Sequence, residues 1–530
     1  MTKNNARCMI IYMEVILLSS TACVLIGEAQ DHSVNQGPQP ERSPLDSSSG
    51  RHQVPRRWWE SAPGIMRVHL KAHGDRPALS PDPAKTSAQL DEIREAGFTA
   101  IEIFAPAEGG NSFGGLDTIN RYRIDPALGS MDDFRRLVRS AHSKGMAVIT
   151  FDNLGYCSVE ALDFLKACDD VKAGRESKET RFFLWSDNAD AQPPGNAPGD
   201  TFFMVRPTHL PGAKPGTFYD SAKHEFWQYS ERAGRYYWTK WAGVDSSGKN
   251  VRLPQYNWGS PEFQEEAEKI VRLWMDTGID GMIIDAVNWY VDHTWQKGRR
   301  RMTEVIASYG NTYSQPEGGG GFHEDPVAWI TEGGWNSVQD YGLGIWWEKG
   351  SDVIENAINN GDPRPIEQAL RDYHDRVVAA GGVLYHFPSR FKEQEKQNLA
   401  LAIVAAVGDL VAGQYPRDSQ NSPEARWLLN TKGAHPALQQ LSSRRRLPTK
   451  ADHKHYAFLR TAPDKSERVL VVMNFEPVPQ TVEVDMSGVA TETLVEIRTN
   501  SSVEYRNDLK LDLPAYGYKL YKLQPVARLP

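Results

Sequence analysis

Predicted strands and helices alternate over two long stretches of this chain, and this alternation limits the possible folds more than any other feature. In the first stretch, strands are separated by helices, with strands at 65–70, 98–104 and 146–151 and helices at 88–96 and 131–143. After residue 257 the alternation resumes, with strands expected at 278–285, 329–332, 382–386 and 409–414. Alternation of this kind is typical of an α/β protein whose parallel strands are connected by crossover helices.

Two segments do not follow this alternation. Residues 158–257 contain Pro/Gly-rich stretches and aromatic clusters, and they hold too much apolar sequence for a linker. From about residue 453 apolar and polar residues alternate with the period of two that is typical of antiparallel strands. We therefore predict a (β/α)8 TIM barrel with an inserted domain after strand 3 and a C-terminal antiparallel β-sandwich domain. The expected boundaries are 57–157 and 258–450 for the barrel, 158–257 for the inserted domain and 451–530 for the sandwich.

The first 27 residues predict an export signal. Basic residues Lys3 and Arg7 precede an apolar run that Glu14 interrupts, and this run is too short and too broken for a membrane span. A weak lipoprotein-type cleavage box leaves a lipid anchor at Cys23 as an open alternative. Residues 28–56 are rich in Gln, Ser and Pro and predict a disordered linker. We therefore expect a periplasmic or extracellular protein, with a lipoprotein as the alternative.

Charge and cysteine content exclude several kinds of partner. The formal net charge of −8 is spread along the chain, and the one dense basic run, 444–446, is expected to face solvent rather than nucleic acid. No Cys or His cluster has the spacing of a zinc site, so neither a metal nor a cofactor is expected. Cys157 and Cys168 lie beyond the leader, and their spacing does not decide whether they are bonded.

The run 278–285 ends in a carboxylate, Asp285, directly after the apolar residues 282–284. Packing gives no reason for an apolar strand to end on an acid. In a β/α barrel, by contrast, the carboxyl ends of the strands carry the chemistry. Asp285 is therefore the first candidate catalytic residue, whereas Asp280, at the start of the same strand, is expected to be structural.

Segments spread over residues 67–523 resemble the α-amylase superfamily, glycoside hydrolase family 13, in their order and spacing. These segments are 124–134, 142–148, 226–229, 236–238, 254–262, 435–438 and 471–475. The resemblance implies a nucleophile at the end of the fourth strand and a general acid/base after the fifth. Asp285 matches the first position, and Glu332 matches the second.

The chemistry of this family requires such a pair of acids. One carboxylate attacks the anomeric carbon, and the other protonates the leaving oxygen and then activates water, with the two groups about 5 Å apart in a retaining enzyme. The acid/base must hold a proton, so Glu332 is expected in a less solvated setting than Asp285. The non-functional alternative is that both acids cap neighbouring helices.

Several positions around this pair differ from the family pattern. Ile283 stands where the family has an Arg that keeps the nucleophile ionised, and Phe387 stands at its third catalytic carboxylate. The other replaced positions are Leu116, Phe151 and Tyr156. All of them would contact one glucose ring, so ordinary amylase or α-glucosidase activity is not expected.

Two functions fit these observations. The first is an exported retaining α-glycoside hydrolase or transglycosylase that acts on an oligosaccharide other than plain starch. Its new polar shell around the sugar is expected to consist of Asp152, Asn153, Tyr156, Asn288, His386 and Arg390. The alternative is a non-catalytic, amylase-like carbohydrate-binding or partner protein, which an apolar plug of Phe151, Ile283 and Phe387 would favour. Because both acids are retained, we favour the enzyme.

A third possibility is a transferase or lyase that acts on a modified sugar. Arg390 would suit an acidic sugar through a bidentate contact. An Arg also stands at this position in ordinary family members, so the argument for an acidic sugar is weak.

Overall fold

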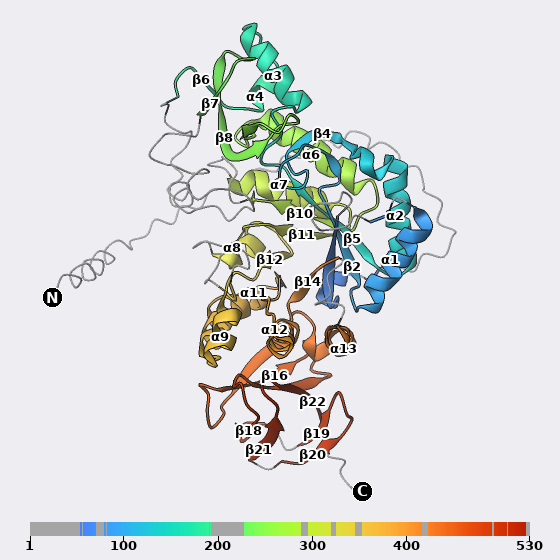
Figure 1. The fold of residues 1–530 in the computed structure, drawn as a ribbon, viewed down its shortest axis with the longest axis vertical. Helices are drawn as coiled ribbons and strands as arrows, with labels where there is room; N and C mark the ends of the chain where they lie inside the picture. Colours follow the sequence, from blue (N-terminus) through green and yellow to red (C-terminus); the bar gives the residue numbers. More distant parts are fainter. Residues whose placement is uncertain are drawn as a thin grey trace, which may run out of the picture. The chain divides into compact units, whose positions relative to one another are not determined.

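A computed structural model describes residues 54–55, 57–69, 79–80, 82–189, 191, 227–287, 295–319, 325–344, 352–415, 422–489, 492–505 and 507–525. Arg51–Pro530 forms one compact unit (Figure 1). The predicted leader with Cys23, nearly all of the predicted linker, and Asn288 lie outside the described residues. The domain boundaries within the compact unit stay predictions.

The centre of the fold is an eight-stranded parallel sheet with the order β11-β10-β5-β2-β1-β14-β13-β12. In chain order its strands are β1 (Gly64–His69), β2 (Ala100–Phe104), β5 (Ala147–Asn153), β10 (Gly281–Asp285), β11 (Tyr313–Pro316), β12 (Ser337–Gln339), β13 (Val383–His386) and β14 (Leu410–Gln414). A hydrogen bond from Asn336 N to Ser314 O joins β12 to β11, the two ends of this order. The sheet therefore closes into the predicted barrel.

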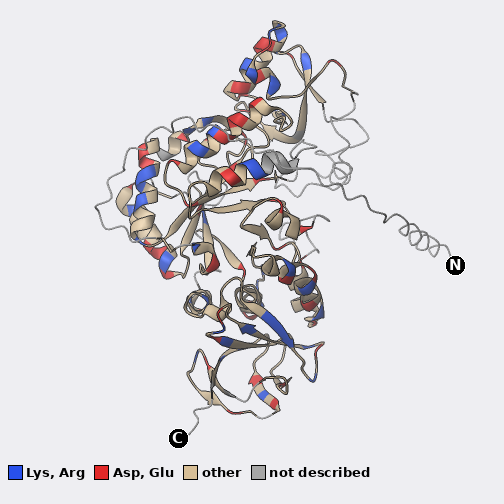
Figure 2. Ribbon diagram, turned by 180° about the vertical axis from the view of Figure 1, so that it is seen from behind, with Lys and Arg blue, Asp and Glu red and all other residues tan. Residues whose placement is uncertain are grey.

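Helices surround the barrel (Figure 1). They are α1 (Pro83–Glu95), α2 (Met131–Ser143), α6 (Pro261–Met275), α7 (Trp295–Ala307), α8 (Pro326–Thr331), α9 (Val353–Asn360), α10 (Arg364–Ala369), the π-helical turn η5 (Leu370–His374), α11 (Asp375–Ala379), α12 (Gln394–Val407) and α13 (Pro423–Ala434). Their starts follow local chemistry: Ser130 caps α2 in a capping box with Asp133, and Ser260 caps α6 before Pro261. Figure 2 shows acidic and basic residues interspersed along these helices, which agrees with a charge that is spread rather than gathered.

The predicted insertion lies between the third and fourth barrel strands. It contains α3 (Leu162–Lys172), α4 (Lys178–Arg181), β6 (Trp185–Ser186), β7 (Trp227–Ser230), β8 (Arg235–Val244) and β9 (Asn250–Pro254). The four strands form a small antiparallel sheet. Cys157 and Cys168 are both buried, and neither is in a disulfide.

The C-terminal segment is antiparallel, as predicted. Its strands are β15 (Ser443–Leu447), β16 (His455–Thr461), β17 (Arg468–Asn474), β18 (Gln480–Asp485), β19 (Glu492–Glu496), β20 (Ser502–Val503), β21 (Asp508–Leu513) and β22 (Tyr518–Pro525). They form a six-stranded and a two-stranded sheet around a shared apolar core.

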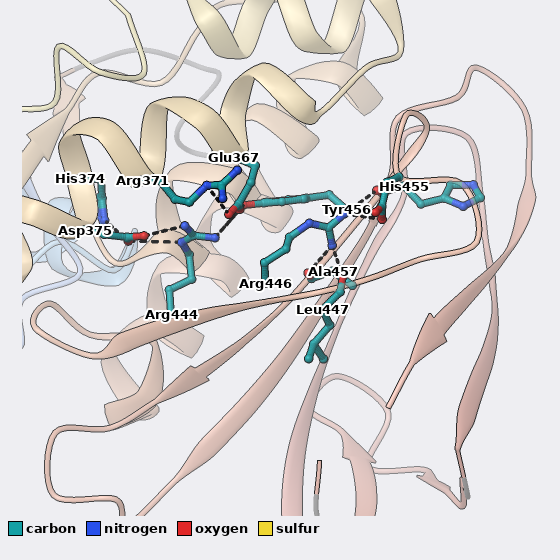
Figure 3. A network of polar contacts seen from close by, with 11 residues as sticks. Glu367, Arg371, His374, Asp375, Arg444, Arg446, Leu447, His455, Tyr456 and Ala457 are labelled. Carbon is teal, nitrogen blue, oxygen red and sulfur yellow. Dashed lines mark hydrogen bonds and ion pairs between the residues drawn. The ribbon is translucent and has the colours of Figure 1, made fainter. Parts of the chain in front are cut away.

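The prediction that residues 444–446 face solvent is wrong for Arg444. Its side chain is 2% exposed, and it pairs with Asp375 of α11 at 2.7 Å and Glu367 of α10 at 2.5 Å (Figure 3). This arginine therefore joins the C-terminal sheet to the barrel helices.

The strand predicted at 329–332 is also wrong. These residues belong to the end of helix α8 and its C-cap, where Asp325 caps the helix and Pro326 begins it. The true fifth and sixth strands, β11 and β12, are only four and three residues long. Such short strands carry little periodicity, and Pro316 at the end of β11 is typical of a loop.

Side-chain alternation in the barrel strands separates two apolar cores. In β10, Ile283 packs inside the barrel with Ile149 and Phe151, whereas Met282 and Ile284 pack outward beneath the helices. Because side chains alternate along a strand, Asp285 faces the same interior as Ile283. Among the described helices, none is long and apolar enough to cross a membrane.

Candidate active site

Two carboxylates lie side by side at the carboxyl ends of β10 and β11. Asp285 ends β10 and is 9% exposed. Glu317 follows β11 directly and is partly exposed. The register pairs Ile284 with Pro316, and Glu317 N donates to Ile284 O at 2.8 Å, so Asp285 and Glu317 stand at the next level on neighbouring strands.

This placement gives the pair a short separation. The backbones of neighbouring strands lie about 4.8 Å apart, a spacing that allows the carboxyl groups the roughly 5 Å separation of a retaining glycosidase. The Glu317 side chain is fixed by the backbone after Asp285, because its Oε2 accepts from Ala286 N at 3.0 Å. Ala286 itself has a φ of 48°, so the chain bends sharply as it leaves β10.

The environment raises the pKa of both carboxyl groups. Burial raises the pKa of Asp285 well above its usual value, and the negative charge of Glu317 raises it further. Burial also raises the pKa of Glu317. Arg67 opposes both shifts, since a nearby positive charge favours the ionised forms. Together the two groups therefore retain a proton to higher pH than isolated carboxyls would, as acid/base catalysis requires.

Tyr156 contacts the first carboxylate directly. Its hydroxyl donates to Asp285 Oδ2 at 3.2 Å, and this hydrogen bond favours the ionised form of Asp285. Tyr156 is 3% exposed and lies in the loop after β5. It is the one residue of the predicted polar shell that the structure places against Asp285 by a direct hydrogen bond among the described residues.

Asp152 and Asn153 are next to the loop that carries Tyr156 and form hydrogen bonds with backbone groups. Asn153 Nδ2 donates to the carbonyls of Leu116 and Tyr156 at 2.9 and 2.8 Å, and its Oδ1 accepts from Gly155 N at 2.7 Å. With its amide used by the backbone and no exposed surface, Asn153 has no group left for a sugar. Asp152 accepts from Asn153 N at 2.8 Å, faces away from the interior residue Phe151, and interacts with the charge of Arg121. Both residues position Tyr156 rather than line the pocket.

A buried cation occupies the barrel interior beneath the two acids. Arg67 of β1 donates to Glu102 of β2 at 2.5 Å, and Tyr385 donates to the other oxygen of Glu102 at 2.9 Å. The rings of Phe104, Phe151 and Phe387 surround its guanidinium, with centroids at 5.1, 4.7 and 5.2 Å. The expected plug of Phe151, Ile283 and Phe387 is thus present as part of one buried cluster, but its aromatic members are arranged around a positive charge.

Arg67 supplies from another strand the charge that Ile283 removes. The guanidinium interacts with both Asp285 and Glu317 and lowers the pKa of each. A cation that acts on the two acids is therefore retained, although it comes from β1 instead of from two residues before the nucleophile.

The structure corrects two of the predicted positions, Glu332 and His386, and leaves the third, Arg390, a prediction. Glu332 caps the end of α8 and is exposed, so it does not follow a strand as predicted. His386 lies on the outer side of the sheet, because it follows the interior residue Tyr385; its Nδ1 is 3.2 Å from Asp340 O. Arg390 is exposed beyond the end of β13.

Glu317 was missed although the sequence carries a signal for it. Like Asp285, it ends a short strand and stands before a change in chain direction, here the glycines that begin at Gly318. Pro316 obscured the strand, and Glu332 offered a longer apolar segment before an acid.

Two known families match the chain. The Alpha amylase, catalytic domain matches residues 82–317, and the Maltogenic Amylase, C-terminal domain matches residues 446–520. The first match ends at Glu317, the second acid of the pair.

Curated relatives are distant. The chain is 25% identical over 232 residues to trehalose-6-phosphate hydrolase of Escherichia coli (strain K12) and 26% identical over 235 residues to probable oligo-1,6-glucosidase 2 of Bacillus subtilis (strain 168). Each match covers 44% of this chain, but only 36% and 35% of the relative. The chain therefore spans little more than a third of the length of the curated relatives it matches.

Solved structures share the fold over most of the chain. The α-amylase from H. orenii superposes with a TM-score of 0.65 at 18% identity, covering 88% of this chain and 100% of that chain. Isomaltulose synthase from Erwinia rhapontici NX5 gives a TM-score of 0.64 at 16% identity, covering 88% and 99%. At these identities the likeness concerns the fold.

Proposed function

The chain belongs to the α-amylase superfamily, and on this premise we propose that it is a retaining glycoside hydrolase or transglycosylase whose catalytic pair is Asp285 and Glu317. The observation that carries the proposal is the placement of both acids at the carboxyl ends of neighbouring barrel strands, with the pKa of Glu317 raised as a general acid requires. Glu317 replaces Glu332 in the role of general acid/base.

The proposed reaction is a double displacement. An Asp285 oxygen attacks the anomeric carbon, the glycosidic C–O bond breaks, and Glu317 gives its proton to the leaving oxygen. A water or a sugar hydroxyl then gives its proton to Glu317 while its oxygen attacks the same carbon and releases Asp285. Tyr156 and Arg67 stabilise the ionised Asp285 that the first step needs.

For the substrate we propose an oligosaccharide α-glycoside other than plain starch. Phe387 and Leu116 replace polar or sugar-stacking residues of the family, so a glucose ring would lose several contacts in its usual orientation. Curated relatives of the chain include enzymes named for trehalose 6-phosphate and for 1,6-linked oligosaccharides. Export to the periplasm or the exterior, with or without a lipid anchor, remains part of this proposal.

A second candidate is a non-catalytic carbohydrate-binding protein. The buried cluster of Phe104, Phe151 and Phe387 supports it, because these rings occupy barrel space near the acids. It does not explain why two acids stand side by side at the carboxyl ends of neighbouring strands.

Matched substitutions on the two glutamates test the proposal. We expect the full chain to turn over at least one member of a panel that contains α-1,4- and α-1,6-linked oligosaccharides, trehalose 6-phosphate and sucrose isomers. Glu317→Gln should then lower kcat/KM by about 10²–10⁴-fold, because general acid/base catalysis is lost, whereas the exposed Glu332→Gln should change it less than about 2-fold.

If Glu332→Gln lowers kcat/KM much more than Glu317→Gln does, the acid/base is Glu332. Turnover that survives both Asp285→Asn and Glu317→Gln would show that the chemistry lies elsewhere. If no glycoside is turned over but oligosaccharides bind in calorimetry, the binding protein is the correct function.

A further inference from the structure

Three buried side chains of metal-ligand type converge on the outer face of the barrel, away from the active-site pair. Asp340 follows β12, Asp409 precedes β14, and His374 ends the π-helical turn η5. Their exposed fractions are 2%, 0% and 1%. One ligand atom from each of the three residues lies within 4.8 Å of the others.

Polar atoms in this cluster lack hydrogen-bond partners among the described residues. They are Asp340 Oδ2, His374 Nε2 and both carboxylate oxygens of Asp409. His374 Nε2 lies 3.0 Å from Asp409 Oδ1, yet the two atoms do not have hydrogen-bond geometry. Buried polar atoms are costly when unpaired, so this number of them in one place needs a physical cause.

A metal ion explains the spacing. In a tetrahedral site with bonds of about 2.0–2.1 Å, ligand atoms lie roughly 3.3 Å from one another. The 3.0 Å separation of His374 Nε2 and Asp409 Oδ1 agrees with two ligands that point at a common ion rather than at each other.

The surroundings of His374 have the form that metal-bound histidines usually show. Its Nδ1 lies 3.3 Å from Asp375 Oδ1, so a carboxylate holds the ring nitrogen opposite Nε2 (Figure 3). Asp375 is held in turn by Arg444 of β15 at 2.7 Å. The orientation of His374 therefore depends on the attached C-terminal sheet. A π-helical turn, a feature frequent at functional sites, carries this histidine.

A second histidine lies next to the cluster. His386 Nδ1 is 3.2 Å from the carbonyl oxygen of Asp340, a contact that fixes the proton on Nδ1 and leaves the Nε2 lone pair available. This Nε2 is buried and has no hydrogen-bond partner in the described part of the chain. His386 also interacts with the charge of Asp409.

We propose that Asp340, His374 and Asp409 bind a divalent transition-metal ion of the Zn²⁺ class. Imidazole nitrogens suit Zn²⁺ and its neighbours, whereas Ca²⁺ and Mg²⁺ prefer sites made of oxygen. Two carboxylates and one neutral imidazole would balance the two positive charges of the ion. The ion would be structural, because the site is closed, and the proposal does not depend on the proposed function.

The alternative is a shared proton. Without a metal, the charge of Asp409 would hold the proton of His374, Asp340 would stay protonated, and the cluster would again be neutral. Lys432 and Arg460 are also buried near Asp409, which would partly offset its charge. In that state the O–H of Asp340 would donate to Asp409, but His374 Nε2, 3.0 Å from Asp409 Oδ1, would still lack hydrogen-bond geometry. That misaligned contact favours the ion.

Metal analysis of the full chain tests the proposal. After treatment with EDTA, dialysis and addition of Zn²⁺, we expect about one equivalent of zinc per chain by mass spectrometry, together with a higher Tm than the metal-free protein. Co²⁺ in place of Zn²⁺ should give the visible absorption of a tetrahedral site. His374→Gln should lose both effects, and Asp375→Asn should weaken Zn²⁺ binding by about 10–100-fold.

His142→Gln is the matched control. His142 Nε2 also pairs with a strand carboxylate on the outer face, Asp280 Oδ2 at 2.7 Å, but it belongs to no three-ligand cluster among the described residues. This variant should keep the full zinc content. Wild-type protein that binds no zinc and shows no rise in Tm with Zn²⁺ would overturn the proposal and establish the shared proton. Equal zinc loss in His374→Gln and His142→Gln would overturn it as well.

Discussion

Two pairs of carboxylates lie at the ends of barrel strands and have different surroundings. Asp285 and Glu317 lie inside the barrel, where a tyrosine hydroxyl, a backbone amide and the Arg67 guanidinium act on them. Asp340 and Asp409 lie on the outer face, where the ring of His374 takes the place of these donors.

The two pairs differ in their access to solvent, and this difference indicates different roles. The inner pair is open on one side, since Glu317 is partly exposed, so a bound molecule can exchange a proton with it. The outer pair is closed, and a carboxylate oxygen of each residue lies within 4.8 Å of the other and of a His374 ring nitrogen. The inner arrangement suits proton transfer to a substrate, and the outer one suits an ion that stays.

The largest effect is expected from the cation of the inner pair. Arg67→Met leaves Glu102, which has no exposed surface, without its ion-pair partner, and should lower the free energy of unfolding by about 3–5 kcal/mol. It should also raise the pKa of Asp285 and Glu317, because the guanidinium lowers both. Denaturant unfolding followed by tryptophan fluorescence measures the first effect.

The double variant Arg67→Met with Glu102→Gln separates the two effects. It removes the unpaired charge of Glu102, so most of the free energy of unfolding should be restored. The acidic limb of the plot of kcat/KM against pH should nevertheless stay at higher pH than in the wild type. The sign follows from the nucleophile: a higher pKa of Asp285 means that a higher pH is needed to ionise it. A double variant with the wild-type pH profile would show that Arg67 acts on the fold alone.

The sequence predicts much of the framework around these pairs and less of the pairs themselves. Helix α2 is predicted at its observed bounds, because the acidic residues of its first turn mark its start and Gly145 marks its end. Asp285 is found because it ends an apolar strand long enough to recognise. Glu317 is missed because β11 is short and ends in proline, and Glu332 is chosen in its place.

The prediction of a polar shell around the sugar fails for a different reason. Asp152 and His386 follow residues that face the barrel interior, so their own side chains point elsewhere, whereas the Asn153 amide is bonded to backbone groups of the loop. Sequence position relative to the family motif does not reveal this alternation unless the strand register is known. The outer cluster is unpredictable from spacing, because its ligands come from three elements that only the closed barrel brings together.

A smaller effect is expected from the hydroxyl above the inner pair. Tyr156→Phe removes the hydrogen bond to Asp285 Oδ2 and keeps the ring. A hydrogen bond to a charged group contributes about 1.5–3 kcal/mol, so kcat/KM should fall by about 10- to 100-fold, with the acidic limb moved to higher pH. An unchanged pH profile, despite a fall in rate, would mean that the hydroxyl contacts substrate instead of setting the ionisation of Asp285.

The smallest effect is expected from Asn153, which bonds the loop that carries Tyr156. Its substitution distinguishes a structural role from a sugar-binding role. Asn153→Ala removes the amide that donates to Leu116 and Tyr156 and accepts from Gly155, so buried backbone groups lose their partners. We expect the free energy of unfolding to fall by about 1–3 kcal/mol. The Kd of oligosaccharide, measured by calorimetry with Asp285→Asn in the background, should stay the same, because Asn153 has no exposed surface. Weaker oligosaccharide binding at unchanged stability would instead show that Asn153 contacts the sugar. In that case the surroundings of Asp285 and Glu317 would not be closed to substrate.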